Sequence, residues 1–267
     1  MGIFVKMIKR IFKRNTHNVV FKFLAGAGRS FNRFYENRNH DIHSNGESYL
    51  LKQVAKLNPA MMFDVGANIG EYARLASKHC AAAKLYCFEP VHETFVKLKE
   101  TTAGNPHIAA MPMGLFSERG CRQINLYPSN AHSSLYDIDK KASHVQSIDL
   151  NTGDYFMAEH GIDFVDLLKI DVEGAEMDVL LGFKEAFTNQ CIRIVQFEYG
   201  HLNIISRQLL IDHYDFFDSC GYLVGKLYPH GVDFRSYELK HEDFIGPNYV
   251  AVRKTDKAAL EILSLRG

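Results

Sequence analysis

The feature that most constrains the fold is an alternation, from about residue 46 onward, between short apolar runs and stretches with helical spacing. The apolar runs, which we expect to be strands, are 61–65, 85–88, 108–115, 164–170, 192–197, 222–227 and 249–252. The stretches with helical spacing are 47–57, 70–78, 93–100, 152–160, 174–187 and 206–219. Because these strands rarely alternate apolar with polar residues, they predict a mostly parallel α/β sheet with helices on both faces.

The chain therefore reads as one catalytic domain over 46–267, preceded by a basic extension over 1–45. Residues 117–150 interrupt the alternation with polar residues, and we expect them to form a β-rich excursion or lid. The sequence contains no internal repeat and no linker rich in proline or glycine.

The first 14 residues predict a basic amphipathic helix. At 100° per residue, the apolar side chains between Ile3 and Phe12 share one face, and five basic side chains share the other. Such a helix is suited to the surface of an anionic membrane through residues 3–14, but docking on the domain or on a second subunit explains the pattern equally well. The apolar run after Val19 is too short to cross a bilayer. We expect a cytoplasmic protein, with peripheral contact at the inner membrane face as an option.

Charge is distributed unevenly along the chain. Residues 1–40 hold nine basic side chains and one acidic one, which leaves 22 basic and 30 acidic side chains in residues 41–267. A body with a net charge of −8 is a poor surface for a phosphate backbone, so we do not expect nucleic acid as a partner. Five scattered cysteines without a C-x-x-C pair give no support for a disulfide framework or a zinc site.

Two residue groups at predicted strand ends indicate a nucleoside cofactor. Gly66 and Gly70 allow a tight turn after the strand at 61–65, but the middle glycine of the dinucleotide motif is missing. Asp64 offers an acceptor for an ammonium group, and Glu89, 25 positions later, offers one for ribose hydroxyls. The pattern favours S-adenosylmethionine over NAD. A turn cap at Asp64 and a surface acid at Glu89 are the structural alternatives.

A third segment, 164–176, places Asp171 and Glu173 at the end of the most apolar strand. The blocks 64–72, 88–90, 168–176 and 196–199, read together in this order, resemble the FkbM family of methyltransferases. The resemblance covers roughly residues 46–254. It implies a Rossmann-like fold with seven strands, one of them antiparallel, and methyl transfer from S-adenosylmethionine, usually to oxygen, on macrolides, sugars or surface polysaccharides.

By this resemblance, the cofactor-binding residues are Asp64, Gly66, Asn68, Gly70, Glu71, Glu89, Pro90, Gly114, Ser117 and Asp171. The resemblance assigns the residues from Asp64 to Gly70 to the methionine part, Glu89 to the ribose, and the segment from Gly114 to Ser117 to the adenine. It places Asp171 nearest to the sulfonium. Residues 1–45 lie outside the resemblance.

A sugar hydroxyl needs a general base, and the catalytic candidates are Asp171, Glu173 and His201. Asp171 comes first, although it could instead position the amino group of the cofactor. The candidates for contact with the acceptor are His132, Ser133, Ser134 and Glu198. Carboxylates at 171, 173 and 198 could also hold a divalent ion, but nothing in the pattern requires one, and we expect no metal.

Two other functions remain open from the sequence. A nucleotide-dependent oxidoreductase also needs a glycine turn and a ribose acid, but the third glycine is missing. A non-catalytic scaffold would keep the fold, yet Asp64, Gly66, Glu89 and Asp171 are all present. The sequence does not identify the acceptor, and an oligomer is compatible with it.

Overall fold

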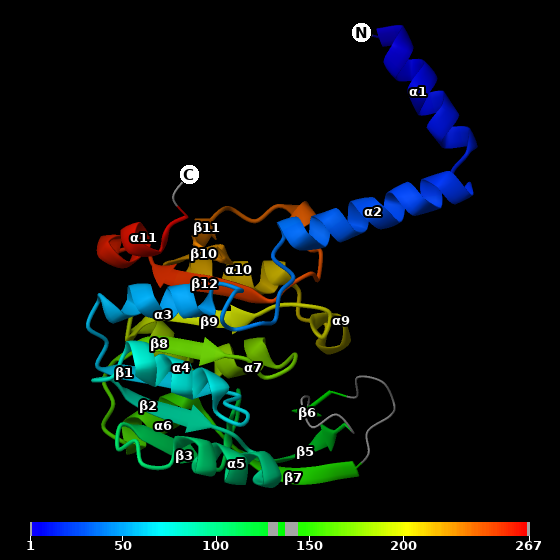
Figure 1. Ribbon diagram of the computed structural model, residues 1–267. Coiled ribbons are helices and arrows are strands. Elements are labelled where there is room, and N and C mark those ends of the chain that lie inside the picture. The colour runs from blue at the N-terminus through cyan, green and yellow to red at the C-terminus, as the bar shows by residue number, and fades with distance from the viewer. Residues whose placement is uncertain (1, 128–132, 137–143, 266–267) are drawn as a thin grey trace.

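The computed structural model describes residues 2–127, 133–136 and 144–265. Its centre is an eight-stranded sheet in the order β11-β10-β12-β9-β8-β1-β2-β3 (Figure 1). The strands are β1 (Met61–Val65), β2 (Lys84–Phe88), β3 (Ile108–Met111), β8 (Val165–Ile170), β9 (Ile192–Glu198), β10 (Tyr222–Tyr228), β11 (Gly231–Phe234) and β12 (Asn248–Arg253). β1, β2, β3, β8 and β9 pair in parallel, so their carboxyl ends meet at one edge of the sheet.

The predicted fold class is confirmed, but the strand count differs from the expected seven. β12 is antiparallel to both β9 and β10, as a single reversed strand would be. β11 then pairs antiparallel with β10 and adds an eighth strand at the edge. The tight connection between Tyr228 and Gly231 makes this hairpin, whose short second strand was not recognised in the sequence.

The β-rich excursion expected over 117–150 forms most of a second sheet of four strands, in the order β4-β7-β5-β6. Its strands are β4 (Gly114–Leu115), β5 (Gly120–Leu126), β6 (Ser133–Ser134) and β7 (His144–Asn151), and we call it the small sheet. The single strand expected over 108–115 is divided at Pro112, which cannot donate a ladder hydrogen bond. Its first half joins the main sheet and its second half joins the small sheet.

Helices cover both faces of the main sheet, as predicted. One face carries α3 (Glu47–Ala55), α4 (Glu71–His79), α5 (His92–Thr102) and α11 (Lys257–Leu263). The other carries α6 (Gly153–Glu159), α7 (Glu176–Leu181), α8 (Lys184–Thr188) and α10 (Leu210–Ser219). Successive strand residues serve opposite faces, since Met62 packs with the first group and Phe63 with the second. The second face is rich in aromatic rings, and Phe63, Phe88 and Phe156 lie 4.8–5.7 Å apart between ring centroids.

Two helices before residue 36 extend away from the body (Figure 1). α1 (Gly2–Arg14) confirms the predicted N-terminal helix, and α2 (Val19–Tyr35) was not predicted. The two helices touch through Phe12 and Phe21, whose ring centroids are 4.7 Å apart. None of the helices in the described part of the chain is both long enough and apolar enough to cross a membrane.

The segment after α2 contacts the body, although it lies within the range assigned to the extension. The Nδ2 of buried Asn37 donates to the carbonyl oxygens of Asn45 and Leu227, at 2.8 and 3.0 Å. The Glu36 carboxylate pairs with the Lys226 ammonium at 3.1 Å. These contacts bring residues 40–42 to the edge where the parallel strands end.

Candidate functional site

A cavity of about 570 Å³ opens at the carboxyl ends of β1, β2 and β8, within the size range of small-molecule sites. Its polar wall includes Gly66, Asn68, Glu89 and Asp171. Its apolar wall comes mainly from the small sheet and includes Leu115, Phe116, Ile124, Ile148 and Leu150. A ligand with a polar and an apolar part therefore has a matching surface for each.

The turn after β1, residues 66–70, is the floor of the cavity, and we call it the glycine turn. Gly66 has φ +83°, and a Cβ there would lie 1.8 Å from the carbonyl oxygen of Asp171. Only glycine fits this position, because both the backbone conformation and the space exclude a side chain. Gly70 (φ +89°) precedes α4 and packs against Leu98, so its role in the described structure is to shape the turn.

Glu89 follows β2 and is buried at the cavity wall. Its carboxylate accepts hydrogen bonds from the backbone N–H of Val91 at 2.9 Å and of Asn68 at 3.1 Å. Burial raises the pKa of Glu89 to about 7, although these two hydrogen bonds act in the opposite direction. The carboxyl group therefore joins the end of β2 to the glycine turn and still faces the cavity.

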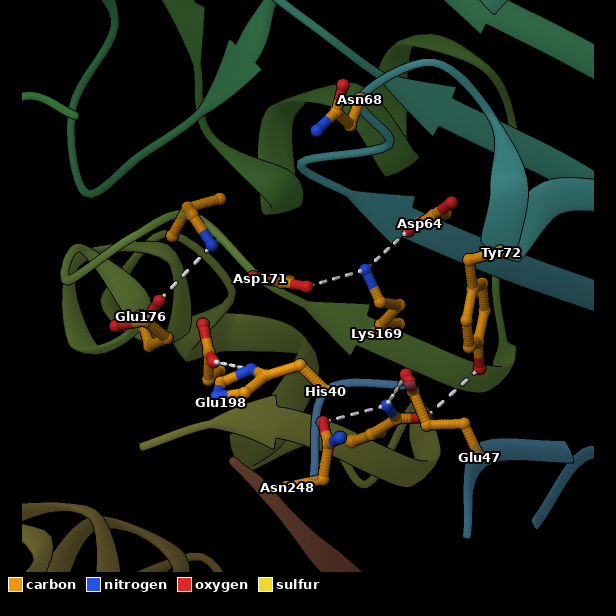
Figure 2. A network of polar contacts seen from close by, with 12 residues as sticks. His40, Glu47, Asp64, Asn68, Tyr72, Lys169, Asp171, Glu176, Glu198 and Asn248 are labelled. Atoms are coloured by element: carbon orange, nitrogen blue, oxygen red, sulfur yellow. Dashed lines mark hydrogen bonds and ion pairs between the residues drawn. The ribbon is translucent and has the colours of Figure 1, made fainter. Parts of the chain in front are cut away.

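Lys169, on β8, is the centre of the charged network in Figure 2. Its ammonium lies 3.2 Å from Asp64 Oδ1 and 3.3 Å from Asp171 Oδ2. Burial alone would lower the pKa of Lys169, but Asp64 and Asp171 raise it above its ordinary value. Asp64 and Lys169 are register partners on adjacent parallel strands, so their side chains lie on the same face of the sheet. The pair is enclosed in the protein, with Asp64 at 0% exposure.

Asp171 and Glu198 form a pair of carboxyl groups that titrate differently. Burial would raise the pKa of Asp171, but the Lys169 ammonium and a hydrogen bond from Glu198 lower it. Burial and the nearby charge of Asp171 raise the pKa of Glu198 well above its ordinary value. The pKa of Asp171 thus lies below that of Glu198, so Asp171 is the first of the two carboxyl groups to lose its proton.

His40 reaches the same group from the N-terminal segment. Its Nδ1 lies 3.9 Å from Glu198 Oε1, its side chain is 65% exposed, and it lines the cavity (Figure 2). Partial desolvation at the cavity wall and the charge of Arg38 lower the pKa of His40, while the charge of Asp171 acts in the opposite direction. A neutral imidazole therefore faces the cavity near pH 7.

The backbone after β8, residues 171–175, forms the rim of the cavity beside Asp171, and we call it the lip. Glu173 takes the left-handed conformation, with φ +56°. The Ser134 hydroxyl donates to the Glu173 carbonyl at 2.8 Å, and Glu176 Oε1 accepts from the N–H of Val172 and Gly174. Burial raises the pKa of Glu176 to about 8. Contacts from both sides therefore fix the shape of the lip.

The structure brings most of the predicted site residues to one cavity. Those that line it are Gly66, Asn68, Glu71, Glu89, Pro90, Gly114, Ser133, Asp171 and Glu173. His132 lies outside the described residues. Asp64, Gly70, Ser117, Ser134, Glu198 and His201 are not among the described residues that line the cavity.

Each of the predicted residues away from the wall has a different place. The Asp64 carboxylate forms an ion pair with Lys169, and the Ser117 hydroxyl donates to Asp178 at 3.5 Å. Ser134 and Glu198 lie behind the wall and contact Glu173 and Asp171. His201 is on an exposed turn after β9. The roles expected for these residues toward a bound ligand stay predictions.

Several residues of the cavity wall were not assigned from the sequence, and among them are the polar side chains His40, Glu47, Tyr72 and Lys169. Lys169 lies inside the segment 164–176 that drew attention to Asp171 and Glu173. The sequence did not show which carboxylates its ammonium would contact. Tyr72 donates to Gln196, which donates to Glu47 at 2.6 Å and thus links α3 and α4 to β9. No group of three histidine, cysteine, aspartate or glutamate side chains in the described residues is arranged to hold a metal ion.

Comparisons with known proteins match this region. Residues 64–224, more than half of the chain, match the family described as the methyltransferase FkbM domain. The chain is 25% identical over 177 residues to the 2-O-methyltransferase NoeI of Sinorhizobium fredii, covering 60% of this chain and 71% of that protein. It is 30% identical over 142 residues to the hexuronic acid methyltransferase AglP of Haloferax volcanii, covering 52% and 56%.

A third relative is the 31-O-demethyl-FK506 methyltransferase FkbM of Streptomyces tacrolimicus, which is 28% identical over 167 residues and covers 51% of this chain and 64% of that protein. The chain thus spans less than two thirds of the length of two of these three relatives. The matched segment contains the glycine turn, Glu89 and the lip. This chain belongs to the FkbM family of methyltransferases.

Proposed function

We propose that the protein transfers a methyl group from S-adenosylmethionine to a hydroxyl of a sugar, in a surface glycan or a related glycoconjugate. The observation that carries this proposal is the cavity that joins the glycine turn, Glu89 and Asp171. Transfer to oxygen is supported by the relative NoeI, a 2-O-methyltransferase, and a sugar acceptor by the relative AglP, a hexuronic acid methyltransferase.

The residues of the cavity fit the proposed cofactor. Glu89 is a buried acceptor for the two ribose hydroxyls, and the half-exposed carboxylate of Asp171 suits a cationic ammonium or sulfonium group. Gly114 and the apolar wall of the small sheet suit the adenine. When bound, S-adenosylmethionine supplies an electrophilic methyl group, and the protein has to align the acceptor oxygen with it.

The charges in this network favour different roles for Asp171 and His40. The lowered pKa of Asp171 makes it a weak base, so we assign it to holding the cationic cofactor. His40 carries an unprotonated ring nitrogen near pH 7 and faces the cavity, so we assign it to accepting the proton of the hydroxyl. Glu198 Oε1 lies 3.9 Å from the imidazole Nδ1, too far for a direct hydrogen bond, and we assign it to the electrostatic environment of the ring.

Calorimetric titration tests the cofactor. The protein should bind S-adenosylmethionine with micromolar affinity, and Glu89→Ala should remove that binding, while Glu93→Ala on exposed α5 should not change it. Binding of NAD without any response to S-adenosylmethionine would refute the proposal and favour redox chemistry.

We also propose that α1 contacts the inner face of an anionic membrane and that the enzyme works in the cytoplasm. The support is the exposed basic set Lys6, Lys9, Arg10, Lys13 and Arg14, next to a body with a net charge of −8. A variant without residues 1–15 should bind vesicles that contain phosphatidylglycerol more weakly than the full chain. Equal binding by the two proteins would show that α1 has no such role.

A further inference from the structure

α2 exposes a continuous aromatic face that nothing in the described structure covers. Residues 20, 23, 24, 27, 31, 34 and 35 recur at the i, i+3, i+4 spacing of one helix face. On this face Phe23, Phe31, Phe34 and Tyr35 are 73–84% exposed, and α2 has no buried residue. Four exposed aromatic rings on one helix are costly in water, so this face requires an occupant.

Charge narrows the choice of that occupant. Residues 1–35 contain eight basic side chains and no acidic one. Lys22, Arg29 and Arg33 lie on α2 opposite the aromatic face. A second copy of the helix would bring two strongly basic segments together, which like-charge repulsion opposes. An anionic bilayer satisfies both features, because aromatic rings enter the boundary between headgroups and acyl chains while basic side chains contact the headgroups.

The body is attached directly at the end of this helix. Tyr35 is the last residue of α2, and Glu36 and Asn37 are then fixed through Lys226, Asn45 and Leu227. His40 and Ile42 already line the cavity. Five residues from Tyr35 to His40 span at most about 18 Å when extended. The cavity is therefore held close to whatever surface α2 occupies.

We propose that α2 lies in the interface of an anionic membrane with its aromatic face inward, and that it presents the cavity to a lipid-linked glycan. The methyl transfer in this inference rests on the proposed function, whereas the membrane-binding surface rests only on the exposed face of α2. It narrows the acceptor to a sugar close to its lipid anchor, because the helix end and the cavity wall are so few residues apart.

Vesicle flotation of the full chain tests the surface. We expect the protein to float with vesicles of phosphatidylcholine and phosphatidylglycerol, and to float much less with phosphatidylcholine alone. The double variant Phe31→Ser/Phe34→Ser should lower the partition coefficient by at least about tenfold. Leu239→Ser is the matched control, because Leu239 is 81% exposed on the body, and it should leave the partition unchanged. Each variant should bind S-adenosylmethionine like the unmodified protein, which shows that the body is folded.

Four outcomes of these experiments can be distinguished. Equal flotation by the double variant and the unmodified protein would overturn the inference. Absence of flotation, together with a dimer in light scattering that the double variant dissociates, would also overturn it and assign the face to a second copy. Loss of flotation in the double variant supports the membrane surface. A fourth outcome separates the two proposals. If the unmodified protein does not bind S-adenosylmethionine but its flotation still depends on Phe31 and Phe34, the membrane surface is supported and the proposed function is refuted.

Discussion

Replacing Lys169 by methionine tests whether the charged network in Figure 2 is a single electrostatic unit. Methionine keeps the unbranched stem but removes the ammonium. Asp64, at 0% exposure, would then be a buried carboxylate without its cation. Removing one partner of such a pair costs about 3–5 kcal/mol of unfolding free energy. Asp171 adds little to this cost, because its side chain is 41% exposed and water screens its charge.

The double variant Lys169→Met/Asp64→Asn separates the charge from the loss of packing. It removes the stranded carboxylate, so we expect it to recover about 2 kcal/mol relative to Lys169→Met alone. The recovery is incomplete because the introduced side-chain amide still lacks a partner, and because Lys169 no longer lies over the Tyr72 ring, 4.9 Å from its centroid.

The assay is urea unfolding followed by circular dichroism, at about pH 8 and about pH 5.5. Burial raises the pKa of Asp64 even with Lys169 present, and without Lys169 the pKa should rise further. The folded single variant would then bind a proton that the unfolded chain lacks, so its stability should fall as pH rises. The penalty is therefore smaller at the lower pH. A cost below about 1 kcal/mol at both pH values, or no recovery in the double variant, would refute the reasoning.

Three further predictions concern other groups of the site. Ribose hydroxyls donate to the ionised form of Glu89, so the affinity for S-adenosylmethionine should fall as the pH drops below about 7. Calorimetry of Glu89→Gln should show weaker binding whose affinity no longer changes with pH in this range. Burial raises the pKa of Glu176 to about 8, so the unfolding free energy should decrease by a few kcal/mol between about pH 4.5 and 8. Glu176→Gln should flatten this decline in urea unfolding, and an unchanged slope would contradict the assignment. The role of His40 can be tested once an acceptor is identified by mass spectrometry of methylated products. His40→Gln should then lower kcat by about 10²–10⁴-fold at unchanged cofactor affinity, whereas the control His43→Gln, at an exposed position, should not lower it. Equal kcat values for His40→Gln and the unmodified protein would exclude His40 as the base.

Strands were predictable from the sequence where an apolar run ends at a clear turn. The strand over 61–65 was found with its observed bounds, because five apolar or buried residues, four of them fully buried, are followed by the glycine turn. The hairpin strand β11 was missed, since two of its four residues are only partly buried and leave a weak pattern. α2 was missed because its apolar residues are not buried in the body, and Gly26 and Gly28 interrupt its helical pattern.

The candidate site was predictable as a set of strand ends, but not as a set of contacts. The glycine turn, Glu89 and Asp171 each follow a recognisable strand, so their meeting at one edge follows from parallel pairing. The pairing of Asp64 with Lys169 required knowing that β8 lies beside β1, which the chain order does not show. His40 is brought to the cavity by the buried contacts of Asn37, and no spacing rule connects it with Asp171.

The close approach between Gly66 and Asp171 determines which parts of the cavity wall can move when a ligand enters or leaves. The Asp171 N–H donates to the Val65 carbonyl at 2.9 Å, and the space for a Cβ on Gly66 is filled by the Asp171 carbonyl. Floor and lip are therefore locked together and must move as one rigid piece. The small sheet contacts that piece through the Ser134 hydroxyl and through the packing of Phe116 and Leu150 in one apolar cluster with Ala175. We therefore expect release of spent cofactor to require a shift of the small sheet rather than of the floor or the lip, and the cost of losing this packing to slow that release.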